Sequence, residues 1–277
     1  MRVNTKQAVK LFFQNTSLVQ VFKEAIANSL DAKATQINVN IFIDSFEKQE
    51  TLRIEIIDNG EGFTDERFKK FCELLNVDED THQGVGRLVY LSYFNEIEVK
   101  SYFQGKLRTF TFDDNFDEDN SNMRLTADSN NKQETALYFS DCSLKRLSSY
   151  SDIYPEYLKQ EILKEFYPRF YLLKNENIDF EIQFKIHVQN RNPKHIVGAF
   201  ETTINNSDIP NLTTVSVDTK TIDLFADTKL DYAIQKTNST SSTFLMNAFC
   251  VDSRTKVLDD IISSENLPSN GYNFIFL

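Results

Sequence analysis

Residues 22–34 read FKEAIANSLDAKA and combine the apolar spacing of a buried helix with a stripe of polar side chains. Glu24, Asn28 and Asp31 stand at positions i, i+4 and i+7, so they lie within roughly 60° of one another on one helix face. Such a stripe consists either of solvated or capping groups or of residues that line a polar site. The segments that follow in the sequence decide between these two interpretations.

Two predicted strands follow this helix. Residues 37–43 carry isoleucine or valine at every second position, which is typical of a half-buried strand. Residues 52–57 repeat the alternation, and the pattern stops at Asp-Asn-Gly, residues 58–60, which is a turn signal. The helix therefore leads into two strands, and the second strand ends in a turn.

Further predicted elements follow in order. Residues 64–77 predict a polar helix, and the loop QGVGR, residues 83–87, opens an apolar helix. Residues 95–112 predict two strands joined near Gln104-Gly105. The acidic, Asn- and Ser-rich residues 113–134 predict a solvated loop or an irregular hairpin before the strand ETALYFSDC.

The second half of the chain has a different pattern. A helix is predicted over residues 154–166, ended by Pro168, and strand-like segments then dominate. A helical stretch, residues 256–265, precedes a last apolar strand, YNFIFL. This order favours an α+β second domain, so we divide the chain into residues 1–172 and 173–277. Because the chain ends inside a strand pattern, we expect the natural protein to continue.

The composition narrows the class of protein. Acidic residues outnumber basic ones by 41 to 30, and the net charge of −11 argues against a large basic footprint for nucleic acid, although it does not exclude a local patch. Three widely spaced cysteines without a CxxC pair predict reduced thiols rather than a zinc site. There is neither a run of about 18 apolar residues nor a signal peptide, so we expect a cytoplasmic protein without a membrane span.

Glycine is scarce and unevenly placed. Only seven of the 277 residues are glycine, and four of them stand in two short motifs, at Gly60, Gly62, Gly84 and Gly86. Glycine is needed where the backbone approaches another group closely or adopts a positive φ. Taken alone, each motif is equally well explained as an ordinary turn after a strand.

Three motifs now stand in a defined order: the helix with Glu24 and Asn28, the strand that ends in DNGEGF, and the loop QGVGR. In this order they resemble the signature boxes of the GHKL ATPases, the superfamily of gyrase B, ninety-kilodalton heat-shock chaperones, histidine kinases and MutL. KEAIANSLDAKATQINV is most similar to the MutL and MORC version of the first box, and HQGVGRLVYLSYF resembles the chaperone version of the third. The resemblance covers about residues 15–140.

The resemblance implies a Bergerat fold, an α+β sandwich in which helices cover one face of a mixed sheet. Residues 1–172 are then the ATP-binding domain, and the second domain resembles a transducer that is truncated at its C-terminus. VDSR, residues 251–254, stands where MutL has VNGR. The transducer lysine of MutL follows the last strand, beyond Leu277, which leaves Lys256 as an in-chain substitute.

The resemblance also implies an ATP site with Mg²⁺. Glu24 is implied as the general base that accepts a proton from attacking water, and Asn28 as the magnesium ligand. An amide oxygen suits a hard cation on a triphosphate without adding charge repulsion. Asp58 is implied as the acceptor for the exocyclic amine of adenine, which selects ATP over GTP. Asp31 is expected to fix the helix end.

Turn and loop positions complete the implied site. Gly60 lets the chain turn, and Gly62 leaves room for the flat base. Asn59 and Phe63 are further candidates beside them. The phosphates are assigned to the glycine-containing loop and its flanks, namely Gln83, Gly84, Val85 and Gly86.

Arg87 and Thr135 are two additional candidates. Arg87 either makes a charge-assisted contact to a phosphate or ties the loop to a neighbouring carboxylate, and both interpretations stay open. Thr135 stands where the family has a Gly-Thr pair that helps to hold adenine through water, but Glu134 replaces the glycine. Residues 64–83 are the implied nucleotide lid, and the acidic residues 78–80 are expected to point to solvent.

The implied function is that of an ATP-gated switch. Nucleotide closes the lid, two subunits dimerise, and slow hydrolysis resets them, in a DNA-repair, DNA-defence or chaperone-like process with a protein partner or a C-terminal effector. The alternative is a nucleotide-sensing module with little hydrolysis that signals to a partner protein. A histidine kinase is disfavoured because no histidine precedes His82. Direct contact with DNA stays open.

Overall fold

A computed structural model gives the fold as two compact units. The first unit holds Met1–Glu161 and Phe180–Ile204, and the second holds Ile162–Asp179 and Asn205–Leu277. The residues that the structure describes are 9, 11, 13, 16–72, 86–116, 123–129, 132–143, 150–191, 198–216, 229–236, 243–251, 254–257 and 264–277.

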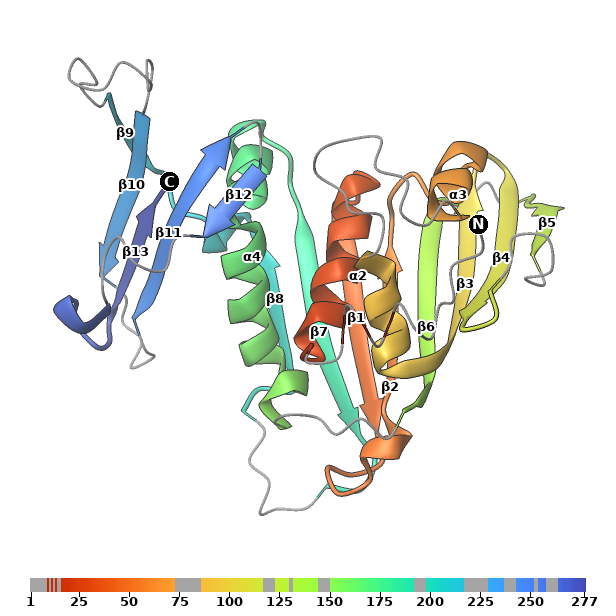
Figure 1. Ribbon diagram of the computed structural model, residues 1–277. Coiled ribbons are helices and arrows are strands. Elements are labelled where there is room, and N and C mark those ends of the chain that lie inside the picture. The colour runs from red at the N-terminus through yellow and green to blue at the C-terminus, as the bar shows by residue number, and fades with distance from the viewer. Residues whose placement is uncertain are drawn as a thin grey trace. The chain divides into compact units, whose positions relative to one another are not determined.

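The described residues of the first unit form an eight-stranded sheet in the order β5-β4-β3-β6-β2-β1-β7-β8 (Figure 1). Its strands are β1 Gln36–Ile43, β2 Arg53–Asp58, β3 Phe94–Phe103, β4 Lys106–Asp113, β5 Arg124–Ala127, β6 Glu134–Cys142, β7 Glu181–Val188 and β8 Glu201–Asn205. β1 pairs in parallel with β7 and antiparallel with β2. The sheet is therefore mixed, as the sequence predicted.

The helical elements include those that the sequence predicted in the first unit, in the predicted order, with one difference in type. They are α2 Val19–Asp31, η1 Gln49–Thr51, α3 Asp65–Cys72, η2 Gly86–Ser92, η3 Tyr150–Ile153 and α4 Pro155–Asn175. The apolar helix expected after QGVGR is a 3₁₀ helix, η2, rather than an α-helix. The polar helix expected over residues 64–77 is described only as far as Cys72.

The core of the first unit lies between α2 and the sheet. In β1 every second residue is buried, at Ile37, Val39, Ile41 and Ile43. α2 buries the face that carries Phe22, Ala25 and Ile26. Figure 1 shows α2 and the neighbouring 3₁₀ helix η2 in front of the same face of the sheet. The buried side chains that alternate along the strands thus pack against those that recur every 3.6 residues along α2, and together they form one apolar layer.

The expected helix stop at Pro168 is wrong, because α4 continues through this residue to Asn175. Proline inside a helix removes one hydrogen bond and costs about 3 kcal/mol. Tyr167 and Phe170, on either side, are 1% and 0% exposed. Burying an aromatic or large aliphatic side chain contributes about 1.5–3 kcal/mol, so the two together outweigh the proline. The local stop signal is therefore overridden by packing.

In the second unit, the described part of the chain forms a five-stranded sheet in the order β12-β11-β13-β10-β9. Its strands are β9 Thr213–Ser216, β10 Lys229–Lys236, β11 Phe244–Val251, β12 Arg254–Val257 and β13 Tyr272–Phe276, and its short 3₁₀ helices are η4 Asn206–Asp208 and η5 Ser264–Asn266. The last predicted strand is confirmed as β13. The helix predicted over residues 256–265 is wrong at its start, which lies in β12, while residues 258–263 are outside the described part.

The structure assigns β7 and β8 to the sheet of the first unit, although both lie beyond residue 172. Parallel pairing places Ile41 of β1 beside Ile186 of β7. The strand-like pattern of residues 181–188 predicted the strand itself, but its partner is remote in sequence and was not predictable from that pattern. The division into an ATPase domain and a transducer-like domain stays a prediction. None of the helices that are described has the length and hydropathy needed to cross a membrane.

The alternation of buried and less buried residues along β1 allows the packing against α2 to be tested. Ile41 is fully buried on the helix-covered face, whereas Asn40 lies on the other face and is only partly buried. We expect Ile41→Ala to lower the free energy of unfolding by about 2–5 kcal/mol, and Asn40→Ala to change it by less than about 0.5 kcal/mol. Urea titration of both variants measures this, and equal losses would contradict the assigned faces.

Candidate functional site

The polar stripe of α2 faces η2. The Nδ2 atom of Asn28 donates a hydrogen bond to the hydroxyl of Tyr90, at 3.0 Å, and lies 3.4 Å from Oε1 of Glu24. Tyr90 is buried, and this burial raises the pKa of its hydroxyl, so it stays protonated. With Nδ2 engaged, the Oδ1 atom of exposed Asn28 has no donor among the described residues. The orientation of this amide leaves an oxygen available for a ligand.

Gly86, the last glycine of the loop motif, contacts the Glu24 carboxylate directly. A Cβ atom at this position would overlap both carboxylate oxygens of Glu24. A side chain at this position would have to displace the Glu24 carboxylate, because that flexible side chain fills the space that a Cβ would occupy. The first and third sequence motifs meet at this contact.

Arg87 carries a buried hydrogen-bonding group without a partner. Its Nη2 atom is buried and makes no hydrogen bond to any residue that the structure describes. The guanidinium lies over the ring of Phe71, 4.8 Å from the ring centre. Burial lowers the pKa of this group, and the negative charge of Glu24 opposes the shift. A buried donor without an acceptor is unfavourable, so this position favours an anion.

Asp58 ends β2 as a buried carboxylate, 6% exposed. Its Oδ2 atom accepts a hydrogen bond from the Ser29 hydroxyl of α2 at 2.9 Å, and its Oδ1 atom accepts one from the Gly60 N–H at 2.8 Å. Burial raises the pKa of the Asp58 carboxyl above its ordinary value of 3.8, although both hydrogen bonds oppose the shift. Two donors thus hold a carboxylate where the strand meets the helix.

A row of polar side chains continues from Asp58 across the sheet. Thr135 of β6 stands opposite Asp58, and Ser101 of β3 stands opposite Thr135. The hydroxyls of Thr135 and Ser101 are 2.9 Å apart, and both residues are buried. Ser101 also accepts a hydrogen bond from the N–H of Phe63 at 2.8 Å. Three strands therefore deliver polar groups to one place under the DNGEGF turn.

Asn59 and Gly62, in the DNGEGF turn, have structural roles within the turn. The Oδ1 atom of Asn59 accepts hydrogen bonds from the N–H groups of Thr35 and Gln36, both at 2.9 Å. Gly62 has a φ of +76°, and a Cβ there would lie 2.7 Å from the Ser101 hydroxyl. The amide of Asn59 is committed to the backbone, and Gly62 leaves room for Ser101.

Phe63 belongs to an aromatic cluster. Its ring packs edge-to-face against Phe71 and Phe110 at 5.4 Å and 5.3 Å between ring centres. Such packing is typical of a core. We therefore exclude Phe63 from the candidate site.

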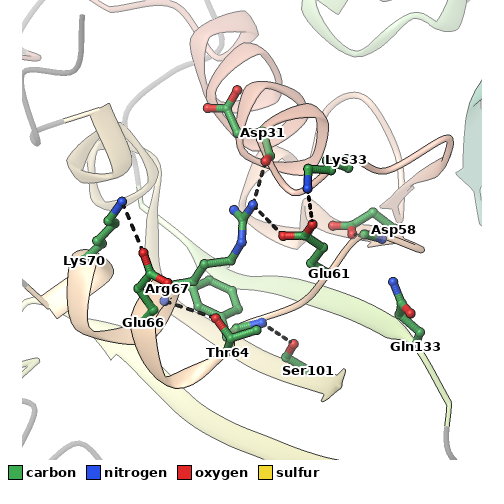
Figure 2. A network of polar contacts seen from close by, with 12 residues as sticks. Asp31, Lys33, Asp58, Glu61, Thr64, Glu66, Arg67, Lys70, Ser101 and Gln133 are labelled. Carbon is green, nitrogen blue, oxygen red and sulfur yellow. Dashed lines mark hydrogen bonds and ion pairs between the residues drawn. The ribbon is translucent and has the colours of Figure 1, made fainter. Parts of the chain in front are cut away.

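Arg67 ties the turn after β2 to the end of α2, as Figure 2 shows. Its Nη2 atom donates to the carbonyl oxygen of Asp31 at 2.7 Å and to Oε2 of Glu61 at 3.1 Å. Lys33 forms an ion pair with the other oxygen of Glu61 at 2.6 Å. Both cations lower the pKa of the Glu61 carboxyl, and Lys33 has the larger effect. The backbone of Asp31 thus helps to secure the helix end.

Arg108 of β4 holds the start of α3. It is 3% exposed, and its Nη1 atom donates to the carbonyl oxygens of Phe63 and Thr64 at 2.6 Å and 2.9 Å. Its Nη2 atom pairs with the carboxylate of Asp65. The planar guanidinium reaches three acceptors at once, which a lysine cannot do.

Sequence reasoning missed several of these residues. Ser29, Tyr90 and Ser101 contact Asp58, Asn28 and Thr135, and each lies far from its partner in the sequence. Ser29 carried a weak signal, because it is a hydroxyl on an otherwise apolar helix face. Tyr90 and Ser101 carried no such signal.

The loop candidates Gln83, Gly84 and Val85, and the acidic residues 78–80, lie outside the described residues.

Residues 16–144 match the family model described as histidine kinase-, DNA gyrase B-, and HSP90-like ATPase. This match and the fold support the GHKL ATPase superfamily for this part of the chain. The resemblance predicted from the three motifs is confirmed, and so is the α+β fold class.

The fold is similar to two solved structures. One, the N-terminal domain of a DNA repair protein, has a TM-score of 0.56 and 15% identity, covering 99% of this chain and 86% of that chain. The other is the 43K ATPase domain of Thermus thermophilus gyrase B in complex with an aminocoumarin, with a TM-score of 0.50 and 13% identity, covering 91% of this chain and 66% of that chain. These likenesses concern the fold alone. No curated protein sequence matches the chain.

The raised pKa of Asp58 has a measurable consequence for stability. The folded state holds this proton more tightly than the unfolded chain, so the stabilisation is complete below pH 3.8 and is lost as the pH rises through the folded pKa. An asparagine side chain at this position does not titrate. We therefore expect the stability of the wild type, relative to Asp58→Asn, to fall between about pH 4 and pH 7. Urea unfolding across this range measures the difference, and a rise with pH would contradict the burial argument.

Proposed function

We propose that this protein binds ATP with Mg²⁺ and hydrolyses it slowly, as an ATP-gated dimerising switch. One observation carries the proposal: the Glu24 carboxylate lies against Gly86 and beside Asn28. A carboxylate beside a phosphate-loop glycine and next to an amide oxygen supplies the two groups that such a reaction uses, a general base and a metal ligand. The family match over residues 16–144 supports ATP as the nucleotide.

We assign the adenine end to Asp58. Each carboxylate oxygen accepts one hydrogen bond from the protein and keeps a lone pair for another. The exocyclic amine of adenine donates to such an oxygen, whereas guanine presents a carbonyl oxygen there and would meet an unpaired acceptor. Thr135, opposite Asp58, is in place to hold the base through water.

We assign the metal to Asn28. Mg²⁺ usually takes one or two protein ligands together with phosphate oxygens and water, so a single amide oxygen fits it. The hydrogen bond from Asn28 Nδ2 to Tyr90 keeps Oδ1 on the open side. When bound, the cation would neutralise charge on the phosphates.

We assign the phosphates to Gly86 and Arg87. Gly86 stands next to Arg87 in the loop motif, and the buried Nη2 atom of Arg87 lacks an acceptor among the described residues. Of the two interpretations of Arg87, this favours the charge-assisted contact with phosphate. The 3₁₀ helix η2 is too short to contribute a helix dipole to the assignment.

Glu24 then acts as the general base. Water attacks the γ-phosphorus, its proton passes to the Glu24 carboxylate, and the bond to the bridging oxygen breaks to release ADP. Asn28, which donates a hydrogen bond to Tyr90, also lies within hydrogen-bond distance of Glu24 and restricts its orientation. We further propose that the second unit acts as a transducer and that the switch serves DNA repair, DNA defence or a chaperone-like process in the cytoplasm, which the MutL-like first motif supports.

The role of Glu24 is tested by Glu24→Ala. We expect ATP binding within a few-fold of the wild type and a loss of turnover of about 10²–10⁴-fold, because only the base is removed. Phosphate release in single-turnover reactions and equilibrium ATP titration measure the two effects. Glu156→Ala is the matched control, since that glutamate is exposed in the first turn of α4, outside the proposed site. Unchanged turnover in Glu24→Ala would mean that another group is the base.

The switch itself is tested by size-exclusion chromatography. We expect the protein with a non-hydrolysable ATP analogue and Mg²⁺ to elute as a dimer, and the protein without nucleotide to elute as a smaller species. Asp58→Ala, which removes the adenine acceptor, should show no shift. A wild type that binds the analogue without changing its elution would contradict dimerisation while leaving the ATP site intact.

A further inference from the structure

A groove of about 280 Å³ lies on the sheet of the first unit, on the face opposite α2. The groove is lined by side chains at or beside the ends of β1, β2, β7 and β8. They include Phe42, Arg53, Lys185, His187, Arg191 and Phe200. Strand alternation fixes the face, because Phe42 and Arg53 stand opposite each other and alternate with the buried Ile41 and Ile54. The ATP site proposed above does not share these residues.

The groove is positively charged in a protein that is acidic as a whole. Three cations line it, Arg53, Lys185 and Arg191, and one carboxylate, Asp44. Lys185 pairs with Glu201 at 3.3 Å, which leaves the two arginines as the available charges. Exposed Arg53 has no ion-pair partner in the part of the chain that is described. The net charge of −11 makes this local excess specific to the groove.

Aromatic rings stand beside these charges. Phe42 and His187 are register partners in β1 and β7, and their rings stack with centres 4.6 Å apart and an angle of 9° between the planes. Both residues are half-buried, so part of the stacked pair reaches solvent. Arg191 lies over the ring of Phe200, 4.1 Å from its centre. The groove therefore combines flat apolar surfaces with guanidinium groups.

The backbone under the groove is hydrogen-bonded throughout. The N–H groups of Gln189 and Asn190 donate to the carbonyl oxygens of Ile43 and Asp44 at 3.0 Å and 2.7 Å, which extends the β1–β7 pairing beyond the strands. The N–H of Ile186 donates to the carbonyl oxygen of Phe200 at 2.9 Å. The rings and charges thus stand on a rigid surface, which limits the entropy lost when a ligand binds.

We propose that this groove binds a nucleotide unit, a flat base that carries a phosphate. The base stacks on the Phe42–His187 pair, and Arg53 and Arg191 make charge-assisted contacts with the phosphate. At about 280 Å³ the groove is smaller than most ligand pockets, which favours one small unit over a longer ligand. The unit is either a free mononucleotide or one residue of a single-stranded nucleic acid, and both present the same chemistry.

The test measures binding of two thymine probes to the whole 277-residue protein, by calorimetry for thymidine monophosphate and by anisotropy for a fluorescein-labelled oligothymidine. Thymine avoids the proposed adenine site. We expect Arg53→Ala with Arg191→Ala to weaken binding at least tenfold. For the oligonucleotide, the slope of log affinity against log salt should fall by about 0.7 for each arginine that no longer neutralises a phosphate. His187→Ala should weaken binding with little change in slope, because stacking carries no charge.

The matched control is Arg124→Ala, which removes an exposed arginine from β5, outside the groove. Its probe binding should equal that of the wild type, and ATP turnover should be unchanged in all groove variants. Binding of the oligonucleotide alone would identify a single strand as the source, and binding of the mononucleotide alone would identify a free nucleotide. If neither probe binds, or if the double arginine variant binds as the wild type does, the proposal is wrong.

Discussion

The buried carboxylate of Asp58 is the constraint on which the site depends. A carboxylate removed from water is costly unless donors replace the water, and here the donors come from the Ser29 hydroxyl and the Gly60 N–H. These two bonds join the end of β2 to α2 and to the turn that follows. The helix face with Glu24 and Asn28 is thereby held at a defined rotation over the sheet. Stability and ligand recognition use the same side chain.

The contact between α2 and η2 joins the remaining parts. The Glu24 carboxylate occupies the space beside Gly86, and the Tyr90 hydroxyl accepts a hydrogen bond from Asn28. A side chain at this position of the loop would have to displace the glutamate of the helix, so each motif restricts the other. The proposed catalytic groups are positioned by packing and hydrogen bonds, which is the condition for catalysis without reorganisation.

The sequence was informative where a pattern is local. Alternation in β1 and the helical spacing of Glu24 and Asn28 predicted the elements and one face of the site. It was uninformative where a neighbour is remote, as for Ser29, Tyr90 and Ser101, whose partners come from other elements. The helix end predicted at Pro168 was wrong, because proline is only a local stop signal. Tyr167 and Phe170 stabilise the helix through their burial, which the local sequence does not reveal. The 3₁₀ form of η2 repeats every three residues, and over only seven residues this period cannot be distinguished from the 3.6-residue period of an α-helix.

The row of Asp58, Thr135 and Ser101 also bears on how the protein folds. These residues come from β2, β6 and β3, which are far apart in the sequence and adjacent only in the finished sheet. Pairing strands across long chain segments is entropically unfavourable and slow. The proposed adenine site is therefore not assembled until the non-local pairings have formed. A nucleotide that needs this row recognises only the completed fold, so it would stabilise the native state by mass action without accelerating the early steps of its formation.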